Sequence, residues 1–368
     1  MSSARLPRWV DLGLIPLLNL FMALAVAGAV IALIGENPFR ALKVMIDGAF
    51  VYPGSIGYTL YYTTNFIFTG LAVSVAFQAR LFNIGGEGQA AIGGLGAALV
   101  CLAIDPFVPG ILVIPLAILA AALFGAAWAF LPGFLQATRG SHVVITTIMF
   151  NFIAAGVLVT LLTGALIRPG QSTPQTRDIA DGARLPKIDD IAGALGYDMP
   201  SSPLNVSIFV ALAACVAVWF LIWRTPFGYR LRTLGESEPA ARYAGVNVPV
   251  TIVLVMCISG GLAGLMAINE VLGAQGKLVI NFTAGYGFAG IAVALIGRSH
   301  PFGIVLASLL FGVLYQGGAE LSFEFRSIDR EMVLVIQGLI ILFSGALAYM
   351  LQNPLSRIFG RRARAQTA

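Results

Sequence analysis

Long apolar runs alternate with short polar segments along almost the whole chain. A helix needs about 20 apolar residues to cross the hydrocarbon core of a bilayer. By that measure the pattern predicts ten membrane-spanning helices, and the eighth is short enough to be a half-helix or an interrupted one. The spans are expected near residues 12–34, 56–78, 82–104, 110–133, 142–166, 204–223, 248–269, 285–297, 302–320 and 331–351.

Composition supports this class of protein. Of the 368 residues, 58% are hydrophobic and only 11% are charged, whereas soluble domains average about 25% charged residues. The 42 glycines agree, because Gly is commoner in membrane helices than in soluble ones. We therefore expect an all-α polytopic membrane protein with one transmembrane domain over residues 1–368.

The basic residues predict the orientation. With both termini in the cytoplasm, most of the 22 Lys and Arg fall in inside segments, as the positive-inside rule requires. Only Glu87, among the 17 Asp and Glu, falls deep within a predicted span. The net charge of +5 is therefore a consequence of membrane orientation, and it does not indicate nucleic-acid binding.

Two outside segments are long. Residues 36–50 carry apolar and charged positions at roughly helical spacing, which predicts an external helix along the membrane surface. Residues 167–203 are polar and contain several Pro and Gly, which predicts an ordered or semi-ordered external loop. This loop is either a connector or a docking surface for an external partner.

The longest inside loop, residues 224–247, is larger than a connector needs to be. Pro226 and Gly228 predict a turn, and Gly235 is expected to break the chain. Ser237 then caps a short helix that ends at Gly245. Small side chains along this helix leave room for a partner surface, although it could also be a surface helix without a partner; they are Ala240, Ala241 and Ala244.

The stretch LFNIGGEGQAAIGG, residues 81–94, is unusually polar for a predicted span. Its glycines predict a kink or a re-entrant start of the helix. An acid at membrane depth, Glu87, is costly and is a functional candidate by default. It could accept hydrogen bonds from backbone N–H groups that glycines expose, pair with Arg80, contact a solute, act in gating or pair with another subunit.

A similar stretch, NFTAGYGFAG, opens the eighth predicted span at Asn281. The two stretches lie in matching places of two five-span halves with opposite orientation, which predicts two inverted five-helix halves. Amides and aromatic faces suit the recognition of bases and sugars, although any single Phe more often faces lipid or the core. The predicted substrate-pathway residues are Asn65, Asn83, Glu87, Gln89, Asn151, Asn269, Asn281 and Phe282.

Three motifs together resemble a known family. The loop TPFGYRLRTLGESEPAARYAGV is similar to the coupling loop of ATP-binding-cassette (ABC) importer permeases, with Thr233 and Ser237 as departures from the usual pattern. FNIGGEGQ resembles the signature of the nucleoside and simple-sugar branch, and ALIGR followed by Pro301 and Gly303 is a third match. The resemblance extends from about residue 36 to residue 350.

This resemblance implies a permease subunit in a bacterial inner membrane, with no cofactor of its own. It implies a second permease subunit, expected to be a different chain, together with cytoplasmic ABC ATPase subunits and an external substrate-binding protein or lipoprotein. The sequence contains no G-x-x-x-x-G-K-[ST] phosphate loop, so ATP hydrolysis is expected in other chains. The resemblance assigns ATPase coupling to Thr225, Gly228, Arg232, Gly235, Glu236, Glu238, Ala240, Ala241 and Gly245.

Three alternative functions compete with this one. The cargo could be another small polar solute, such as a branched-chain amino acid or a vitamin, instead of a nucleoside or simple sugar. The chain could be an ATP-independent secondary transporter, but Glu87 alone is not the chain of acids typical of proton coupling. It could be an intramembrane enzyme, but no nucleophile–base pair or metal-ligand cluster is present around His142 or His300.

Overall fold

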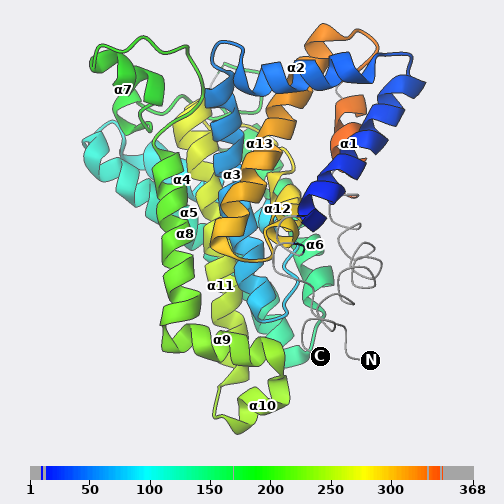
Figure 1. The fold of residues 1–368 in the computed structure, drawn as a ribbon. Coiled ribbons are helices and arrows are strands. Elements are labelled where there is room, and N and C mark those ends of the chain that lie inside the picture. Colours follow the sequence, from blue (N-terminus) through cyan, green and yellow to red (C-terminus); the bar gives the residue numbers. More distant parts are fainter. Residues whose placement is uncertain (1–9, 11–13, 169, 330, 340–341, 343–368) are drawn as a thin grey trace, which may run out of the picture. The chain divides into compact units, whose positions relative to one another are not determined.

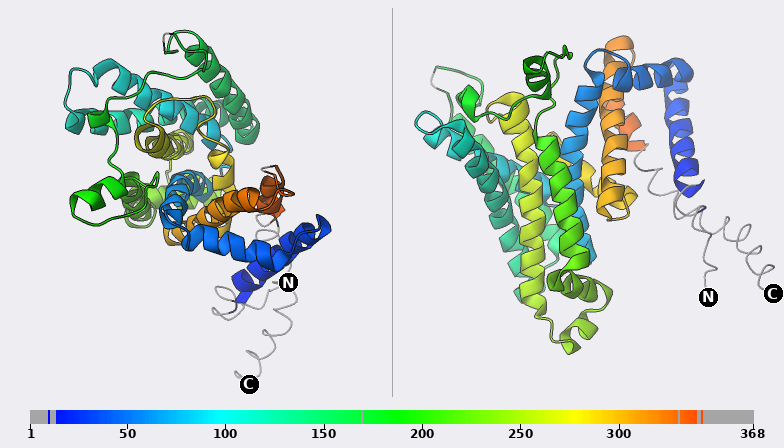
Figure 2. Two further views of the ribbon diagram at one scale, coloured as in Figure 1. Left: turned by 90° about the horizontal axis from the view of Figure 1, so that it is seen from above. Right: turned by 60° about the vertical axis from the view of Figure 1, so that its left-hand side comes forward.

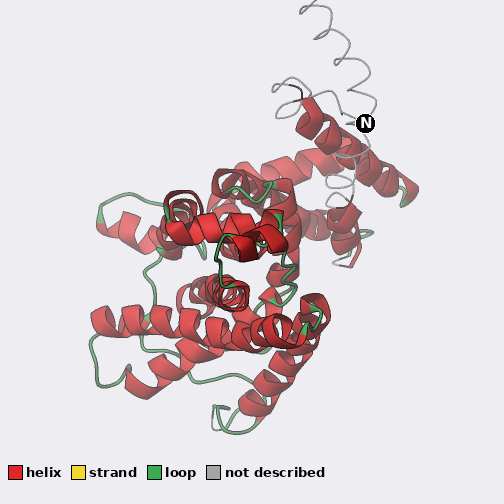
Figure 3. Ribbon diagram, turned by 90° about the horizontal axis from the view of Figure 1, so that it is seen from below, coloured by secondary structure: helices red, strands yellow, loops and turns green. Residues whose placement is uncertain are grey.

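A computed structural model describes the whole chain except residues 1–9, 11–13, 169, 330, 340–341 and 343–368. The described residues form helices joined by loops, with no strand among them beyond isolated bridges (Figure 3). The expectation of a nearly all-helical protein is confirmed.

Within the described residues, 7 helical segments are long and apolar enough to cross a membrane. Each falls on a predicted span, and two shorter apolar helices, Leu24–Leu33 and Tyr286–Ile296, fall on two more. Residues 331–339 are helical, and the rest of the last predicted span lies largely outside the described residues. The long segments are α3 (Ser55–Gln78), α4 (Gly86–Ile104), α5 (Gly110–Arg139), α6 (Val143–Thr163), α8 (Ser207–Arg224), Val248–Gln275 and α13 (Pro301–Glu324).

The chain divides into two compact units, one made of residues 1–52 with 313–368 and the other of residues 53–312. The first unit contains α1 (Ile15–Leu33) and α2 (Pro38–Phe50). The Asn37 side chain caps α2 by accepting the backbone N–H groups of Phe39 and Arg40 at 2.9 and 3.3 Å. The helix predicted within residues 36–50 is thus present; its position at a membrane surface stays a prediction.

In the second unit α11 (Val248–Ala267) packs along α5, α4 and α3 (Figures 1 and 2). Glycines allow this close approach. A Cβ placed on Gly264 would lie 3.2 Å from the Cα of Gly125, and one on Gly96 would meet the ring of Phe124. Small residues let backbones approach in the manner typical of membrane helices, where packing and not water exclusion drives association.

The two ends of the second unit differ. At one end the chain turns through α9 (Pro226–Glu236) and α10 (Glu238–Tyr243), and α7 (Ile188–Ala194) lies at the other end (Figure 1). The predicted turn at Pro226 and Gly228 is wrong, because both residues lie in the first turn of α9. Proline is favourable at that position because its missing N–H would be unbonded there anyway.

The predicted external loop is ordered. Thr176 N–H donates to the Leu278 carbonyl and Leu278 N–H donates to the Thr176 hydroxyl, each at 3.0 Å. Ile179 N–H donates to the Gly276 carbonyl at 2.8 Å. These bonds attach the loop to the segment that leads from residue 276 towards α12 (Tyr286–Ile296).

Candidate functional site

The segment before α4 is held by a side-chain amide in place of helical hydrogen bonds. Asn83 Oδ1 accepts the Gly85 N–H at 2.9 Å, and its Nδ2 donates to Gln89 Oε1 at 3.0 Å and to Ser259 Oγ at 2.8 Å. Helix α4 therefore begins only at Gly86. The predicted interruption at this place is confirmed.

Glu87 lies in the first turn of α4, nearer the helix start than the sequence placed it. Its two carboxylate oxygens accept the backbone N–H groups of Gly285 and Gly287 at 2.9 and 2.8 Å. The Thr283 hydroxyl and the Phe288 N–H also hydrogen-bond to this carboxylate. The acid thus occupies the N-terminus of α12, where unbonded N–H groups and the helix dipole favour a negative charge.

The two glycine-rich stretches meet at this point. A Cβ on Gly86 would lie 3.3 Å from the Gly287 carbonyl oxygen, and one on Gly287 would clash with the backbone at Glu87. Glycine on both sides therefore lets the N-termini of α4 and α12 approach closely enough for the carboxylate to reach. Arg80 is not the partner of Glu87; it lies 3.9 Å from Glu236 instead.

A cavity of about 230 Å³, which we call the inner cavity, adjoins Glu87. Asn151 holds one wall, because it accepts the Gly88 N–H at 2.9 Å and donates to the Ile84 carbonyl at 3.0 Å. The inner cavity therefore combines an acid, two amides and a hydroxyl with an apolar wall. Its lining residues are Glu87, Gly88, Ala91, Asn151, Ala155, Leu158, Val159, Ile280, Asn281 and Thr283.

Asn281 is the polar lining residue whose side-chain donors and acceptor are unused. Its side-chain amide makes no hydrogen bond within the part of the chain that the structure describes, and the residue is exposed. Its backbone has φ of 59°, a left-handed conformation that asparagine tolerates better than most residues. The donor and acceptor of this amide are available to a solute.

Other predicted pathway residues lie elsewhere. Asn83 and Gln89 bond to each other, and Phe282 packs against Gly94, where a Cβ would meet its ring. Asn65 and Asn269 belong to a separate buried cluster, where Asn269 Nδ2 donates to Asn65 Oδ1 at 2.8 Å. Of the eight predicted pathway residues, the inner cavity brings together only Glu87, Asn151 and Asn281.

That buried cluster contains an acid that sequence reasoning missed. Glu270 is 2% exposed and accepts hydrogen bonds from the Tyr61 hydroxyl, from Asn65 Nδ2 at 2.7 Å and from Gln275 Nε2 at 3.3 Å. The predicted span ended at residue 269, but the helix continues as a π-helix over Ile268–Gln275. Glu87 is therefore not the only acid buried within a spanning segment. The apolar residues that continue through INEVLGAQ were the signal in the sequence that this helix extends beyond residue 269.

A second hollow has a volume of about 300 Å³ and lies where α9 meets the end of α3. We call it the coupling groove because residues predicted to act in coupling line it. Gly235 allows this contact, because a Cβ there would clash with the Gln78 carbonyl oxygen. Gly235 does not break the chain as predicted; it lies in the last turn of α9. The lining residues are Ala79, Arg80, Leu81, Gln136, Leu234, Gly235, Glu236, Ser237, Glu238 and Ile252.

The junction of α8 and α9 uses three of the predicted coupling residues. Thr225 caps α9 by accepting the Gly228 N–H at 3.1 Å. Gly228 packs against the last carbonyls of α8, which a Cβ would meet. Arg232 donates to one of them, the Ile222 carbonyl. These contacts fix the direction in which α9 leaves the membrane-spanning helix.

Helix α10 matches its prediction in outline. Ser237 Oγ accepts the Ala240 N–H at 3.4 Å, and Gly245 follows the helix with φ of 75°. Glu238 pairs with Arg242 at 2.6 Å. Ala241, however, is fully buried within the chain itself, so it cannot offer a surface to a partner, whereas Ala240 and Ala244 are exposed.

Comparison with known proteins identifies the family of this chain. Residues 55–345 match the family described as branched-chain amino acid transport system / permease component. The chain belongs to this family of ABC transporter permeases. The permease is 36% identical over 332 residues to the guanosine ABC transporter permease protein NupP of Bacillus subtilis, covering 90% of this chain and 92% of that one.

Two further relatives have similar coverage. The permease is 32% identical over 357 residues to the glucose ABC transporter permease protein TsgB13 of Haloferax volcanii, covering 97% of this chain and 93% of that one. It is 31% identical over 334 residues to the nucleoside ABC transporter permease protein NupB of Lactococcus lactis, with 90% of each chain covered. The expected membership of the ABC importer permeases is confirmed.

In the permease an ion pair helps to hold the loop of residues 167–203. Asp105, directly after α4, receives Arg177 Nη2 at 2.5 Å and the Ala180 N–H at 2.8 Å, and its side chain is 0% exposed. Burial acts to raise the pKa of the Asp105 carboxyl, but the bonds from Arg177 and Ala180 outweigh it and hold the pKa below its ordinary value. Asp105 therefore stays ionised and fastens the loop to α4.

Proposed function

We propose that the permease moves a nucleoside or a simple sugar across the inner membrane by alternating access, driven by separate ATPase subunits. The observation that carries this proposal is the Asn281 amide, which is exposed on the inner cavity with no hydrogen bond to another described residue. Nucleosides and sugars are neutral and rich in donors and acceptors, and they also have apolar faces. A site with few placed polar groups and an apolar wall suits such solutes.

Within this proposal Glu87 has a supporting role. Its carboxylate already accepts the Gly285 and Gly287 N–H groups, so it holds the α4 and α12 termini together beside the cargo. Asn151, which bonds to the backbone at Ile84 and Gly88, positions the facing wall. Asn281 makes the direct contact with cargo.

The proposed topology has ten spans in two inverted five-helix halves, with both termini in the cytoplasm. The meeting of the α4 and α12 N-termini supports the inverted arrangement, since interrupted helices of opposite halves meet around transport sites. The permease is then a non-catalytic subunit. ABC ATPase subunits dock on the coupling groove and α10, and a second permease chain of different sequence completes the pore.

The external binding protein or lipoprotein would dock on residues 167–203. Hydrogen bonds from Thr176 and Ile179 connect this loop to residues 276–278, which lie just before the cavity residues Ile280 and Asn281. Docking on the loop can therefore move one wall of the inner cavity. This connection favours a docking role over that of a plain connector.

Uptake into cells tests the cargo assignment. Cells carrying the complete transporter are given radiolabelled guanosine, glucose, leucine or riboflavin, with the chromosomal permease either wild type or Asn281→Ala. We expect saturable uptake of guanosine or glucose, with KM raised roughly tenfold by the substitution, because a lost hydrogen bond of about 1.4 kcal/mol corresponds to that factor. Thr160→Ala, on α6 but not among the residues that line the cavity, is the control.

Each outcome has a defined meaning. Uptake of leucine or riboflavin alone would replace the proposed cargo class. A KM that Asn281→Ala leaves at the wild-type value would remove Asn281 from the cargo site. Uptake that persists after depletion of ATP would contradict the ATP-driven mechanism.

A further inference from the structure

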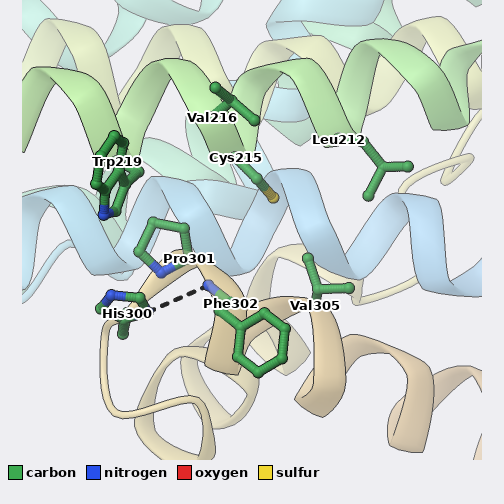
Figure 4. Close-up of a pocket in the computed structure, with 8 residues that line it drawn as sticks. All are labelled: Leu212, Cys215, Val216, Trp219, His300, Pro301, Phe302 and Val305. Carbon is green, nitrogen blue, oxygen red and sulfur yellow. Dashed lines mark hydrogen bonds between the residues drawn. The ribbon is translucent and has the colours of Figure 1, made fainter.

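A third hollow, of about 370 Å³, lies on the side of the second unit between α8 and the start of α13 (Figure 4). We call it the lateral groove. Leu212 lines the end of the groove that is farther from the C-terminus of α8. Trp219 and His300 line the other end, and Cys215 lies between the two ends. Both helices are long and apolar enough to span the membrane, and the rim is open, with Val216 and Phe302 each 67% exposed.

The distance along α8 from Leu212 in the groove to the end of the helix is close to half the thickness of the hydrocarbon core. Leu212 and Arg224, the last residue of α8, are separated by about 18 Å at 1.5 Å per residue. Half of the hydrocarbon core is about 15 Å thick. A lipid tail that reached Leu212 would therefore place its headgroup close to Arg224.

A cationic side chain and free hydrogen-bond donors lie beside one end of the lateral groove. The Arg224 guanidinium lies 5.2 Å from the centre of the Trp219 ring, and no described residue accepts a hydrogen bond from the Trp219 indole N–H. His300 Nδ1 accepts the Phe302 N–H at 3.3 Å, so its neutral ring carries the proton on Nε2. None of the described residues that line the groove is acidic.

We infer that the lateral groove binds an anionic phospholipid. One acyl chain lies along Leu212, Cys215 and Val216, and the phosphate accepts hydrogen bonds from Arg224, Trp219 and His300. An apolar slot with a cationic end is complementary to a lipid tail with an anionic head, and basic pockets between membrane helices on the cytoplasmic side recognise such headgroups. The inference rests on the proposed orientation, with α9 and α10 in the cytoplasm, and not on the cargo.

Quenching of Trp219 fluorescence by brominated lipids tests this inference. The full-length permease with Trp9, Trp128 and Trp223 replaced by Phe is reconstituted in phosphatidylcholine vesicles containing dibrominated phosphatidylglycerol or dibrominated phosphatidylcholine. We expect the anionic lipid to bind at least about fivefold more tightly beside Trp219, since one basic residue near the surface contributes about that factor. Arg224→Gln should remove the preference.

Arg139→Gln is the matched control, because Arg139 is also the last residue of its helix, α5, but it is Arg224 that stacks on the Trp219 ring. It should keep the headgroup preference. Equal quenching by the two lipids, or equal losses in the two variants, would overturn the inference. Absence of quenching by either lipid would mean that polypeptide covers the groove, which would also overturn it. Transport is not measured, so these results are independent of the cargo proposal.

Discussion

The Glu87 carboxylate in the first turn of α4 lies 2.8 Å from the backbone nitrogen of Gly287 in the first turn of α12. An acid of one interrupted helix therefore caps the start of another that is 200 residues away in sequence. The helix terminus supplies the hydrogen-bond donors that a carboxylate requires at membrane depth. The same residue forms part of the inner cavity wall, so this helix contact also shapes the cavity.

Replacing Glu87 should weaken the α4–α12 contact. Hydrogen bonds to a charged group contribute about 1.5–3 kcal/mol, and Glu87→Gln leaves one amide oxygen for two backbone donors. We expect a lower unfolding temperature in detergent and at least about a tenfold loss of uptake, since 1.4 kcal/mol corresponds to that factor.

Arg80→Gln is the control for this substitution, because the Arg80–Glu236 pair is exposed and its atoms are 3.9 Å apart. Such pairs contribute about 0–1 kcal/mol, so the unfolding temperature should remain near the wild-type value. Equal and negligible effects of the two substitutions would show that Glu87 is not needed for the helix contact.

Gly235→Val should disturb the junction of α9 with α3. Any Cβ at this position meets the Gln78 carbonyl, so α9 must move away from the end of α3. We expect ATPase activity of the assembled transporter to persist while uptake per ATP falls. Gly156→Ala is the control, because an added Cβ at this helical position has open space around it. This variant should keep the wild-type uptake per ATP. A wild-type value in Gly235→Val would count against a coupling role of the groove.

Glu238→Arg separates a coupling role from a stability role. The Glu238–Arg242 pair is exposed and spaced i,i+4, so it contributes only about 0.3–0.5 kcal/mol. The unfolding temperature should therefore stay almost unchanged. If α10 contacts the ATPase, the reversed charge should reduce both cargo-stimulated ATPase activity and uptake. Unchanged values of both would exclude Glu238 from that contact.

The Asp105–Arg177 contact predicts a pH-dependent stability. The folded-state pKa of Asp105 lies below its ordinary value, so its contribution is present above the unfolded pKa of about 3.9. That contribution is lost as the pH falls from there through the folded-state pKa. Asp105→Asn should therefore unfold at a lower temperature than wild type near neutral pH, by an amount that shrinks as the solution is acidified to about pH 3. A difference that is constant with pH would show that the carboxylate charge is not responsible.

Glu270 should be more sensitive to loss of polarity than to loss of charge. Glu270→Gln keeps an oxygen that accepts from Tyr61 and Asn65, whereas Glu270→Leu leaves these buried donors without their partner. Each unsatisfied group costs about 1–3 kcal/mol, so Glu270→Leu should lower the unfolding temperature much more than Glu270→Gln. If the two variants unfold at the same temperature, the cluster does not depend on these hydrogen bonds.

Local sequence patterns determined most of the helices. Apolar runs long enough to span a bilayer placed α3 to α6, α8, α11 and α13, because in lipid the backbone of such a run must satisfy its own hydrogen bonds. Helix α10 was also predictable, since Ser237, Pro239 and Gly245 act on the backbone nearest to them. The interruption before α4 followed in the same way from Gly85 and Gly86.

Only the tertiary structure decided which polar side chains meet. Sequence reasoning grouped Asn65, Asn83, Asn151, Asn269 and Asn281 as one pathway, but helix rotation and packing send them to different clusters. The predicted span also ended before Glu270. Hydropathy cannot show that Tyr61, Asn65 and Gln275 donate hydrogen bonds to this carboxylate and so allow it to be buried. The partner of Glu87 could not be read from its neighbours for the same reason: hydrogen bonds between distant segments depend on how the helices pack, and a linear pattern does not contain that information.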